Sequence, residues 1–121
     1  MNKNINTVEK FIYGLANKDT SDMPLSEDII LISPLTPGKI YKGKKEMLEF
    51  LTKRAFPKLP ITGSEIEKHM PVGTNIVITL WTLLLENNIK VPIFDYLEVE
   101  NGLITKVRPY FDPRPILPFL K

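Results

Sequence analysis

Cysteine is absent from the sequence, and histidine occurs only once, as His69. Without cysteine the chain can form neither a disulfide framework nor a thiolate metal site. A single histidine also argues against a zinc site, because neutral imidazole is the usual nitrogen ligand of zinc. The sequence therefore predicts a protein that uses no metal and no other cofactor.

Strong net charge and long apolar runs are also missing. The chain has 16 Lys and Arg against 14 Asp and Glu, which gives a net charge of +2. The basic residues form no stripe interleaved with aromatic residues, so nucleic acid is not an expected partner. No run approaches the roughly 18 apolar residues of a membrane-spanning helix, and no apolar leader segment opens the chain. We expect a cytoplasmic protein that binds neither nucleic acid nor a membrane.

The overall composition is that of a soluble globular protein. The 121 residues are 43% apolar and 25% charged, which are ordinary values for this class. This length supports one hydrophobic core but not two. We expect a single domain over residues 1–121.

Two helices are predicted from apolar residues that recur at helical spacing. The first covers residues 4–18, where Asn6 and Glu9 resemble a capping box. The second follows Gly43 and ends before Pro57, because proline cannot continue a helix. The apolar positions are Val8, Phe11, Ile12, Leu15 and Ala16 in the first helix and Met47, Phe50, Leu51 and Ala55 in the second.

From Ile61 onward the apolar period changes to two residues, which indicates strands. Turn-forming pairs separate the later strands, so neighbours are expected to be antiparallel. The expected strands are 29–32, a short edge strand at 40–41, and then 61–70, 74–86, 89–99 and 103–112. This order predicts an α+β fold, a cone-shaped curved sheet that is mostly antiparallel, with helices packed on its concave face.

The last hairpin decides which way Asp95 points. A two-residue loop at Asn101–Gly102 would pair Asp95 with Arg108 and would mix apolar and charged side chains on one face. A three-residue loop that starts at Glu100 shifts the pairing by one residue and places the apolar and the charged side chains on opposite faces. We adopt the second register, which places Asp95 on an apolar inner face together with Phe111.

An ionised carboxylate on an apolar face is costly unless something compensates it. Asp95 must therefore be paired, hydrogen-bonded, hydrated, or protonated with a raised pKa. A hydrated pocket beneath the helices would make Asp95 a candidate catalytic residue. A hydrogen bond inside the core would instead make it a structural residue, and both alternatives stay open.

Three stretches carry a family resemblance. They are Glu100-Asn101-Gly102-Leu103-Ile104, Tyr110-Phe111-Asp112-Pro113, and Gly43 after Ile40-Tyr41-Lys42. Together they resemble the SnoaL-like proteins of the nuclear transport factor 2-like superfamily, over nearly the whole chain. The resemblance implies an α+β cone and a homodimer through the sheet. It implies a fold more than a reaction, because the family includes isomerases, cyclases, epoxide hydrolases and non-catalytic binders.

The catalytic residues of ketosteroid isomerases, which belong to that superfamily, match this chain at one position of three. Asp95 stands where those enzymes have a protonated Asp that donates a hydrogen bond. Ser33 stands where they have the catalytic base, and Phe11 stands near their donor tyrosine. In SnoaL-type cyclases an Asp base and a His line the pocket. That pattern implies Asp95 or Asp112 as the base and His69 as its partner.

Further residues are candidates for contact with a ligand. Phe11 and Phe111 are expected on the pocket wall. Tyr13 lies off the apolar stripe of the first helix, so it either reaches the pocket mouth or lies on the surface. His69 is either a pocket residue or a solvated residue at a strand end. Trp81 lies in a strand that is apolar on both faces, so it lines either the pocket or a homodimer interface.

Three functions remain open from the sequence. The first is a SnoaL-like enzyme of isomerase, cyclase or lyase type that acts on an apolar small molecule through a buried carboxylate. The second is a non-catalytic binder of such a molecule. The third is a dimeric scaffold whose cone is filled by side chains. The absence of a second acid–base group beside Asp95 favours binding over catalysis.

Overall fold

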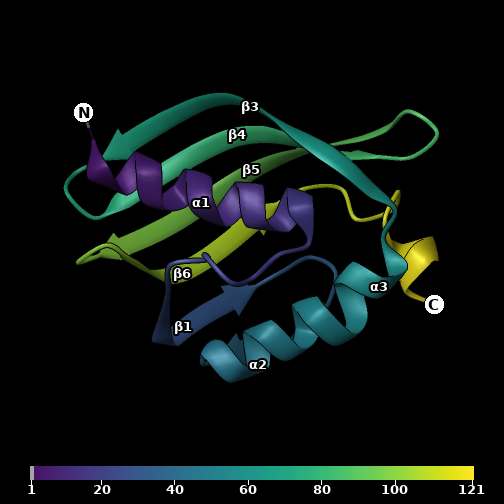
Figure 1. Ribbon diagram of the computed structural model, residues 1–121, viewed down its shortest axis with the longest axis horizontal. Coiled ribbons are helices and arrows are strands. Elements are labelled where there is room, and N and C mark those ends of the chain that lie inside the picture. The colour runs from purple at the N-terminus through teal and green to yellow at the C-terminus, as the bar shows by residue number, and fades with distance from the viewer. Residues whose placement is uncertain (1) are drawn as a thin grey trace.

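A curved six-stranded sheet and two helical segments make up the computed structural model, which describes residues 2–121 (Figure 1). The helical elements are α1 (Lys3–Asn17), α2 (Lys44–Glu49), the π-helical η1 (Phe50–Ala55), α3 (Phe56–Lys58) and the 3₁₀ turn η2 (Leu117–Leu120). The strands are β1 (Leu25–Ile32), β2 (Ile40–Lys42), β3 (Ile61–Val72), β4 (Ile76–Leu85), β5 (Ile89–Glu100) and β6 (Leu103–Tyr110). The predicted α+β class is confirmed.

The cap of α1 differs from the predicted one. The side chain of Asn2 accepts a hydrogen bond from the backbone N–H of Asn4 at 2.8 Å, so Asn2 is the N-cap. The predicted capping box of Asn6 and Glu9 is wrong, because Asn6 lies inside the helix. The helix ends at Asn17, and the cap residue Lys18 takes the left-handed conformation common after helix ends.

The second helical segment runs through α2, η1 and α3 and ends at Lys58, beyond the predicted stop. Pro57 lies in α3 directly after the π-helical η1, and beyond it the backbone N–H of Leu59 still donates to the Ala55 carbonyl at 3.0 Å. Leu59 is extended and precedes Pro60, so the helix stops there. No helix within residues 2–121 is both long enough and apolar enough to cross a membrane.

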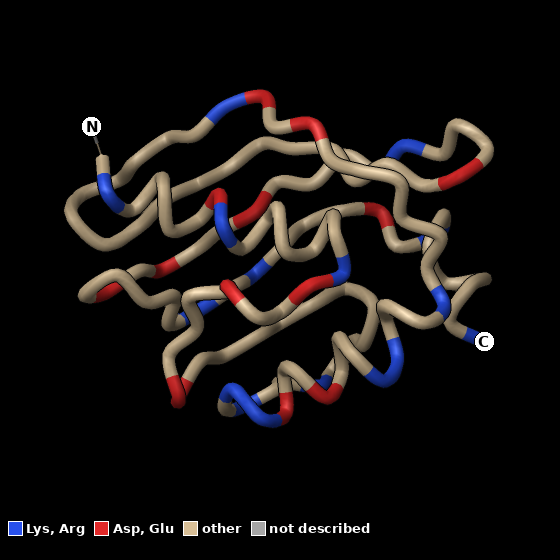
Figure 2. Tube along the Cα trace, in the orientation of Figure 1, with Lys and Arg blue, Asp and Glu red and all other residues tan. Residues whose placement is uncertain are grey.

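The strands lie in the order β2-β1-β6-β5-β4-β3. β1 and β6 are parallel, and every other neighbouring pair is antiparallel. α1 crosses the face of the sheet over β3 and β4, and α2 lies beside β1 (Figure 1). Charged residues of both signs are spread along the trace, but β4 carries none (Figure 2). The strand order and pairing make the sheet open and mixed, and both helical segments lie on one face.

The turn between β5 and β6 contains two residues, Asn101–Gly102, and both have positive φ, 51° and 77°. The predicted three-residue loop is therefore wrong. A β-bulge just after the turn shifts the pairing by one residue in the opposite sense, so that Asp95 pairs with Pro109 and not with Val107, its partner under the three-residue loop. The bulge also turns Ile104 into the core and leaves Leu103 43% exposed. Asp95 therefore lies on the inner face, as predicted, but a β-bulge and not a three-residue loop places it there.

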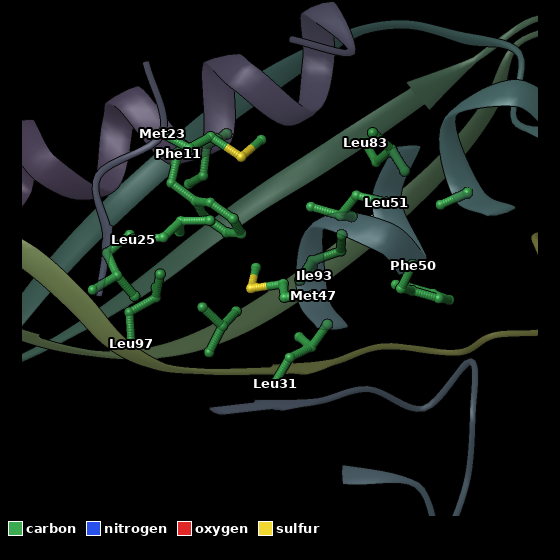
Figure 3. Close-up of a cluster of buried hydrophobic side chains, with 14 of the residues drawn as sticks. Phe11, Met23, Leu25, Leu31, Met47, Phe50, Leu51, Leu83, Ile93 and Leu97 are labelled. Atoms are coloured by element: carbon green, nitrogen blue, oxygen red, sulfur yellow. The ribbon is translucent and has the colours of Figure 1, made fainter. Parts of the chain in front are cut away.

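The hydrophobic core lies between the helices and the concave face of the sheet. Phe11 projects from α1, Met47 from α2, and Ile93 and Leu97 from β5 into one space (Figure 3). All four side chains are buried. The candidate site lies within this core.

Candidate functional site

A small cavity lies between the helices and the concave face of the sheet. Its volume is about 100 Å³, which is below the ~150 Å³ of a protein cavity that accommodates benzene. Phe11 and Leu15 line it from α1, and Met47 and Phe50 line it from the second helical segment. These four side chains therefore do not fill the cone completely.

The wall of the cavity is almost entirely apolar. Asp95 is its single ionisable group in the described part of the chain, and Ser33 is its single hydroxyl. The Ser33 oxygen already accepts a hydrogen bond from the backbone N–H of Leu35 at 3.2 Å. Any polar recognition inside this cavity therefore depends chiefly on Asp95.

The alternation of β5 places Asp95 on the inner face, where it is 1% exposed. Its strand neighbours are Thr79 on β4 and Pro109 on β6. Asp95 Oδ2 accepts a hydrogen bond from the indole Nε1–H of Trp81 at 3.1 Å. Asp95 Oδ1 is buried and has no hydrogen-bond partner among residues 2–121. Such an orphaned buried oxygen is unusual in a folded protein and marks this position as a binding candidate.

Burial raises the pKa of Asp95 to about 7, against the opposing effect of the hydrogen bond from Trp81. Near neutral pH the side chain is therefore divided between a neutral acid and a carboxylate. Because Trp81 donates to Oδ2, the acid proton is favoured on Oδ1, the oxygen without a partner. Asp95 can thus donate a hydrogen bond as an acid or accept a proton as a carboxylate.

A second polar cluster ties α1 to the sheet. His69 Nε2 lies 3.0 Å from a carboxylate oxygen of Glu9, and His69 Nδ1 lies 2.8 Å from the Thr79 hydroxyl. The carboxylate can only accept, so Nε2–H donates to Glu9, and Nδ1 shares a hydrogen bond with the Thr79 hydroxyl. None of the three residues lines the cavity. This cluster therefore joins β3, β4 and α1 and lies apart from the ligand space.

Solved structures similar to this one share a single architecture. An NTF2-like protein of unknown function from Cytophaga hutchinsonii is 22% identical, with a TM-score of 0.72 over 93% of this chain and 92% of that one. A candidate SnoaL-like polyketide cyclase from Jannaschia sp. CCS1 is 12% identical, with a TM-score of 0.75 over 98% and 91%. A candidate ketosteroid isomerase from Kribbella flavida is 18% identical, with a TM-score of 0.73 over 91% and 78%.

The chain has the nuclear transport factor 2-like (NTF2-like) fold. The predicted resemblance to SnoaL-like and ketosteroid isomerase-like proteins is confirmed as a resemblance of fold. No protein-family profile matches the sequence, and no curated protein does. At these identities the likeness shows the fold and not the reaction.

Within the NTF2-like fold the predicted site residues separate into two groups. Asp95, Phe11, Trp81 and Phe111 line the cavity together. Trp81 is 3% exposed and points inward, so it is a wall residue and lies away from the outer face.

The other three predicted site residues, Asp112, Tyr13 and His69, lie outside the cavity wall. Asp112 is exposed and forms a bidentate pair with Arg114, in which Nε donates to Oδ1 and Nη2 donates to Oδ2, and these hydrogen bonds lower the pKa of the carboxyl. Tyr13 is 49% exposed, because it lies off the buried stripe of α1. His69 is engaged on both ring nitrogens, as described above. Direct contact with a ligand in the cavity is therefore not available to these residues in this conformation.

Sequence reasoning missed part of the NTF2-like cavity wall. Ile116 lies in the tail after β6, is 1% exposed, and lines the cavity. The signal was present in the alternation of proline with Ile116, Leu117, Phe119 and Leu120. Glu9 was also missed as the partner of His69, because the two lie 60 positions apart.

Proposed function

We propose that the protein binds a small apolar molecule that carries one oxygen, and that protonated Asp95 donates a hydrogen bond to that oxygen. The observation that carries the proposal is the buried Oδ1 of Asp95, which lacks a partner among residues 2–121 and belongs to a side chain on the cavity wall. A ligand oxygen would supply the missing partner, and the apolar wall would cover the rest of the ligand. The solved structures with this fold support a ligand site between helices and sheet only by analogy.

The size of the cavity limits the ligand. A volume of about 100 Å³ is far below the roughly 300–1,000 Å³ of pockets for drug-sized molecules. A short branched chain or a single small ring is the appropriate class, and cyclohexanone is a probe at the upper limit of that size. Methylenecyclohexane has the same shape without the oxygen and is the matched control probe.

Trp81 is the single tryptophan in the chain and touches Asp95, so its fluorescence reports on the site directly. We expect cyclohexanone to bind at pH 6 about tenfold more tightly than methylenecyclohexane, since one hydrogen bond to a buried acid distinguishes them. Binding should weaken as the pH rises through about 7, because ionised Asp95 has no hydrogen to donate.

Two variants test whether Asp95 binds the ligand by donating a hydrogen bond. Asp95→Asn keeps an N–H donor where the acid had its O–H, so it should bind cyclohexanone with no pH dependence between 6 and 9. Asp95→Leu removes the donor and should bind the two probes equally. Equal binding of the two probes by the wild-type chain at pH 6 would overturn the proposed function.

Catalysis is the second candidate, and the pKa of about 7 favours it, because a group of this pKa can both take and return a proton near neutral pH. In an isomerase-type reaction the Asp95 carboxylate would remove a proton from carbon 2 of cyclohex-3-enone. Return of that proton to carbon 4 gives cyclohex-2-enone, with no other reactant. The enolate oxygen on carbon 1 of the intermediate would need a donor, and the Ser33 hydroxyl on the same wall is available.

The two candidate functions give different results in deuterated water. An enzyme should form conjugated cyclohex-2-enone, which carries deuterium at carbon 4 in the fraction of turnovers in which the proton on Asp95 exchanges with solvent before it is returned. Asp95→Asn should then retain binding but lose turnover, because an amide cannot accept the proton. Binding without any isomerisation or exchange by the wild-type chain would identify a non-catalytic binder.

A further inference from the structure

A second hollow lies at a notch between the C-terminal ends of β1 and β6. The pairing of these parallel strands ends at Leu31 and Val107, whereas β6 continues beside β5 as far as Tyr110. Beyond Val107 the edge of β6 therefore has no strand beside it on the β1 side. A groove of about 340 Å³ occupies this place, lined by residues of the 32–39 segment and by residues 108–111. We call it the notch groove.

The notch groove adjoins the cavity. Ser33, Pro109 and Phe111 line both spaces. Pro109 is also the direct strand partner of Asp95, and such partners have Cβ atoms about 5 Å apart. A ligand beside Asp95 can therefore extend past Pro109 into the notch groove.

The charge of the notch groove is of one sign. Lys39 and Arg108 line it, and none of its described lining residues is acidic. Lys39 is partly compensated, because its Nζ lies 3.8 Å from a carboxylate oxygen of Glu46 in an exposed pair. Arg108 forms no ion pair within the described chain. It pairs with Tyr96 across the strands, so its side chain leaves β6 on the outer face and lines the groove from the open edge of the strand, with its guanidinium 5.4 Å from the ring centroid of Tyr110. The groove therefore offers about one uncompensated positive charge.

A buried hydroxyl in the same groove also lacks a partner. Thr36 lines the notch groove, and its Oγ1 is buried without a hydrogen-bond partner in residues 2–121. Buried polar atoms are nearly always hydrogen-bonded, and exceptions call for an explanation such as an absent ligand. A ligand oxygen held by Arg108 within this groove would give the Thr36 hydroxyl an acceptor.

We propose that the notch groove binds the carboxylate of a ligand whose apolar body lies in the cavity beside Asp95. The inference rests on the proposed function, because it assigns a second group to the same ligand. One uncompensated guanidinium suits the planar, singly charged carboxylate, which accepts two parallel N–H hydrogen bonds. The ligand class is thus a short monocarboxylate with one small ring or branched chain and a carbonyl or hydroxyl at its far end.

The test compares 4-oxocyclohexanecarboxylate with its primary amide, which has the same shape without the charge. Both are titrated at pH 6 in low salt, with Trp81 fluorescence as the readout. The acid should bind about tenfold more tightly than the amide, the lower range for a charge-assisted hydrogen bond at an exposed guanidinium. Addition of 0.5 M salt should remove most of that difference.

Substitutions test whether the difference in affinity between the acid and the amide arises in the notch groove. Arg108→Gln should bring the acid close to the amide, and Lys39→Gln should have a smaller effect. Lys68→Gln removes an exposed charge on β3, an edge strand that is separated from β6 by β5 and β4, and should change nothing. Thr36→Val should weaken binding of the acid without lowering stability, because it deletes a hydroxyl that has no partner in the free chain.

The outcomes separate the two proposals. Equal affinity for acid and amide, or a preference for the acid that survives Arg108→Gln, overturns the notch groove proposal. If cyclohexanone still binds in those cases and depends on Asp95, the proposed function stands alone. If neither cyclohexanone nor the acid binds, the proposed function has failed and the notch groove proposal falls with it.

Discussion

The indole Nε1–H of Trp81 donates a hydrogen bond to Oδ2 of Asp95 across 3.1 Å. The two residues lie on neighbouring strands and on a diagonal, since Trp81 pairs with Ile93 and Asp95 pairs with Thr79. Trp81 satisfies one carboxyl oxygen and its own buried N–H in a single contact. The other carboxyl oxygen remains available, and this division makes Asp95 a candidate for recognition of a ligand.

Asp95 should make the protein less stable as the pH rises from about 4 to about 7. Burial raises the pKa of Asp95 from 3.8 to about 7 in the folded chain. In this window the folded chain holds a proton that the unfolded chain has released, so the free energy of unfolding falls by about 1.4 kcal/mol per pH unit, or about 4 kcal/mol in all. Below and above the window both states have the same protonation at this group. Urea denaturation from pH 3 to pH 9 measures the change.

Asp95→Asn is the control for that profile, because it keeps the shape and cannot ionise. The free energy of unfolding of the variant relative to the wild type should be constant below about pH 4 and rise by about 4 kcal/mol by pH 8. Parallel profiles for the two proteins would show that Asp95 does not titrate as the structure indicates.

Trp81→Phe should raise the pKa of Asp95 further. The substitution keeps an aromatic ring but deletes the N–H that stabilises the charged carboxylate. It should also lower the free energy of unfolding by about 1–3 kcal/mol, because Oδ2 loses its partner. A carbon-13 NMR titration of the Asp95 carboxyl measures the pKa. An unchanged pKa would mean that the hydrogen bond has no electrostatic effect.

His69→Leu should destabilise the fold without affecting the cavity. The variant leaves the buried Thr79 hydroxyl and the Glu9 carboxylate without their shared partner, at a cost of about 2 kcal/mol. Cyclohexanone binding should be unchanged, because His69 is not on the cavity wall. His69→Gln retains hydrogen-bonding capacity and should lose less stability. Weakened binding at unchanged stability would place His69 in the functional site after all.

We propose a homodimer through the outer face of the sheet. Leu80, Phe94 and Tyr110 are direct strand partners and form one row across β4, β5 and β6. Phe94 is 44% exposed and Tyr110 is 51% exposed in the single chain. Exposed apolar patches of this kind mark interfaces between proteins. Sedimentation equilibrium at micromolar concentration should give twice the monomer mass.

Phe94→Glu should give a monomer, because it introduces a charge at the centre of that row. Ile40→Glu is the matched control, since Ile40 is 47% exposed but lies on β2 at the edge of the sheet. This control should remain dimeric. A wild-type chain that sediments as a monomer would reject the interface.

The sequence predicted the elements better than their connections. Helical spacing identified the buried stripe of α1, where Val8, Phe11 and Ile12 are buried. The period of two identified β3 to β6. The turn residues led to a wrong loop length. Asn101 and Gly102 form a two-residue turn, and a bulge next to the turn changes the strand register. A bulge leaves no distinct local signature, so only the packing of Ile104 into the core reveals it.

The sequence by itself determined the fold class and the face on which Asp95 lies. The alternation of apolar and polar residues is a local property, and it decides which side chains of a strand are buried. Tertiary structure decided everything that gives Asp95 its chemistry. The donor from Trp81, the apolar surroundings that raise the pKa, and the notch beside Pro109 come from segments that meet only in the folded chain. Their relative positions depend on strand register and helix packing, which are set by the whole core.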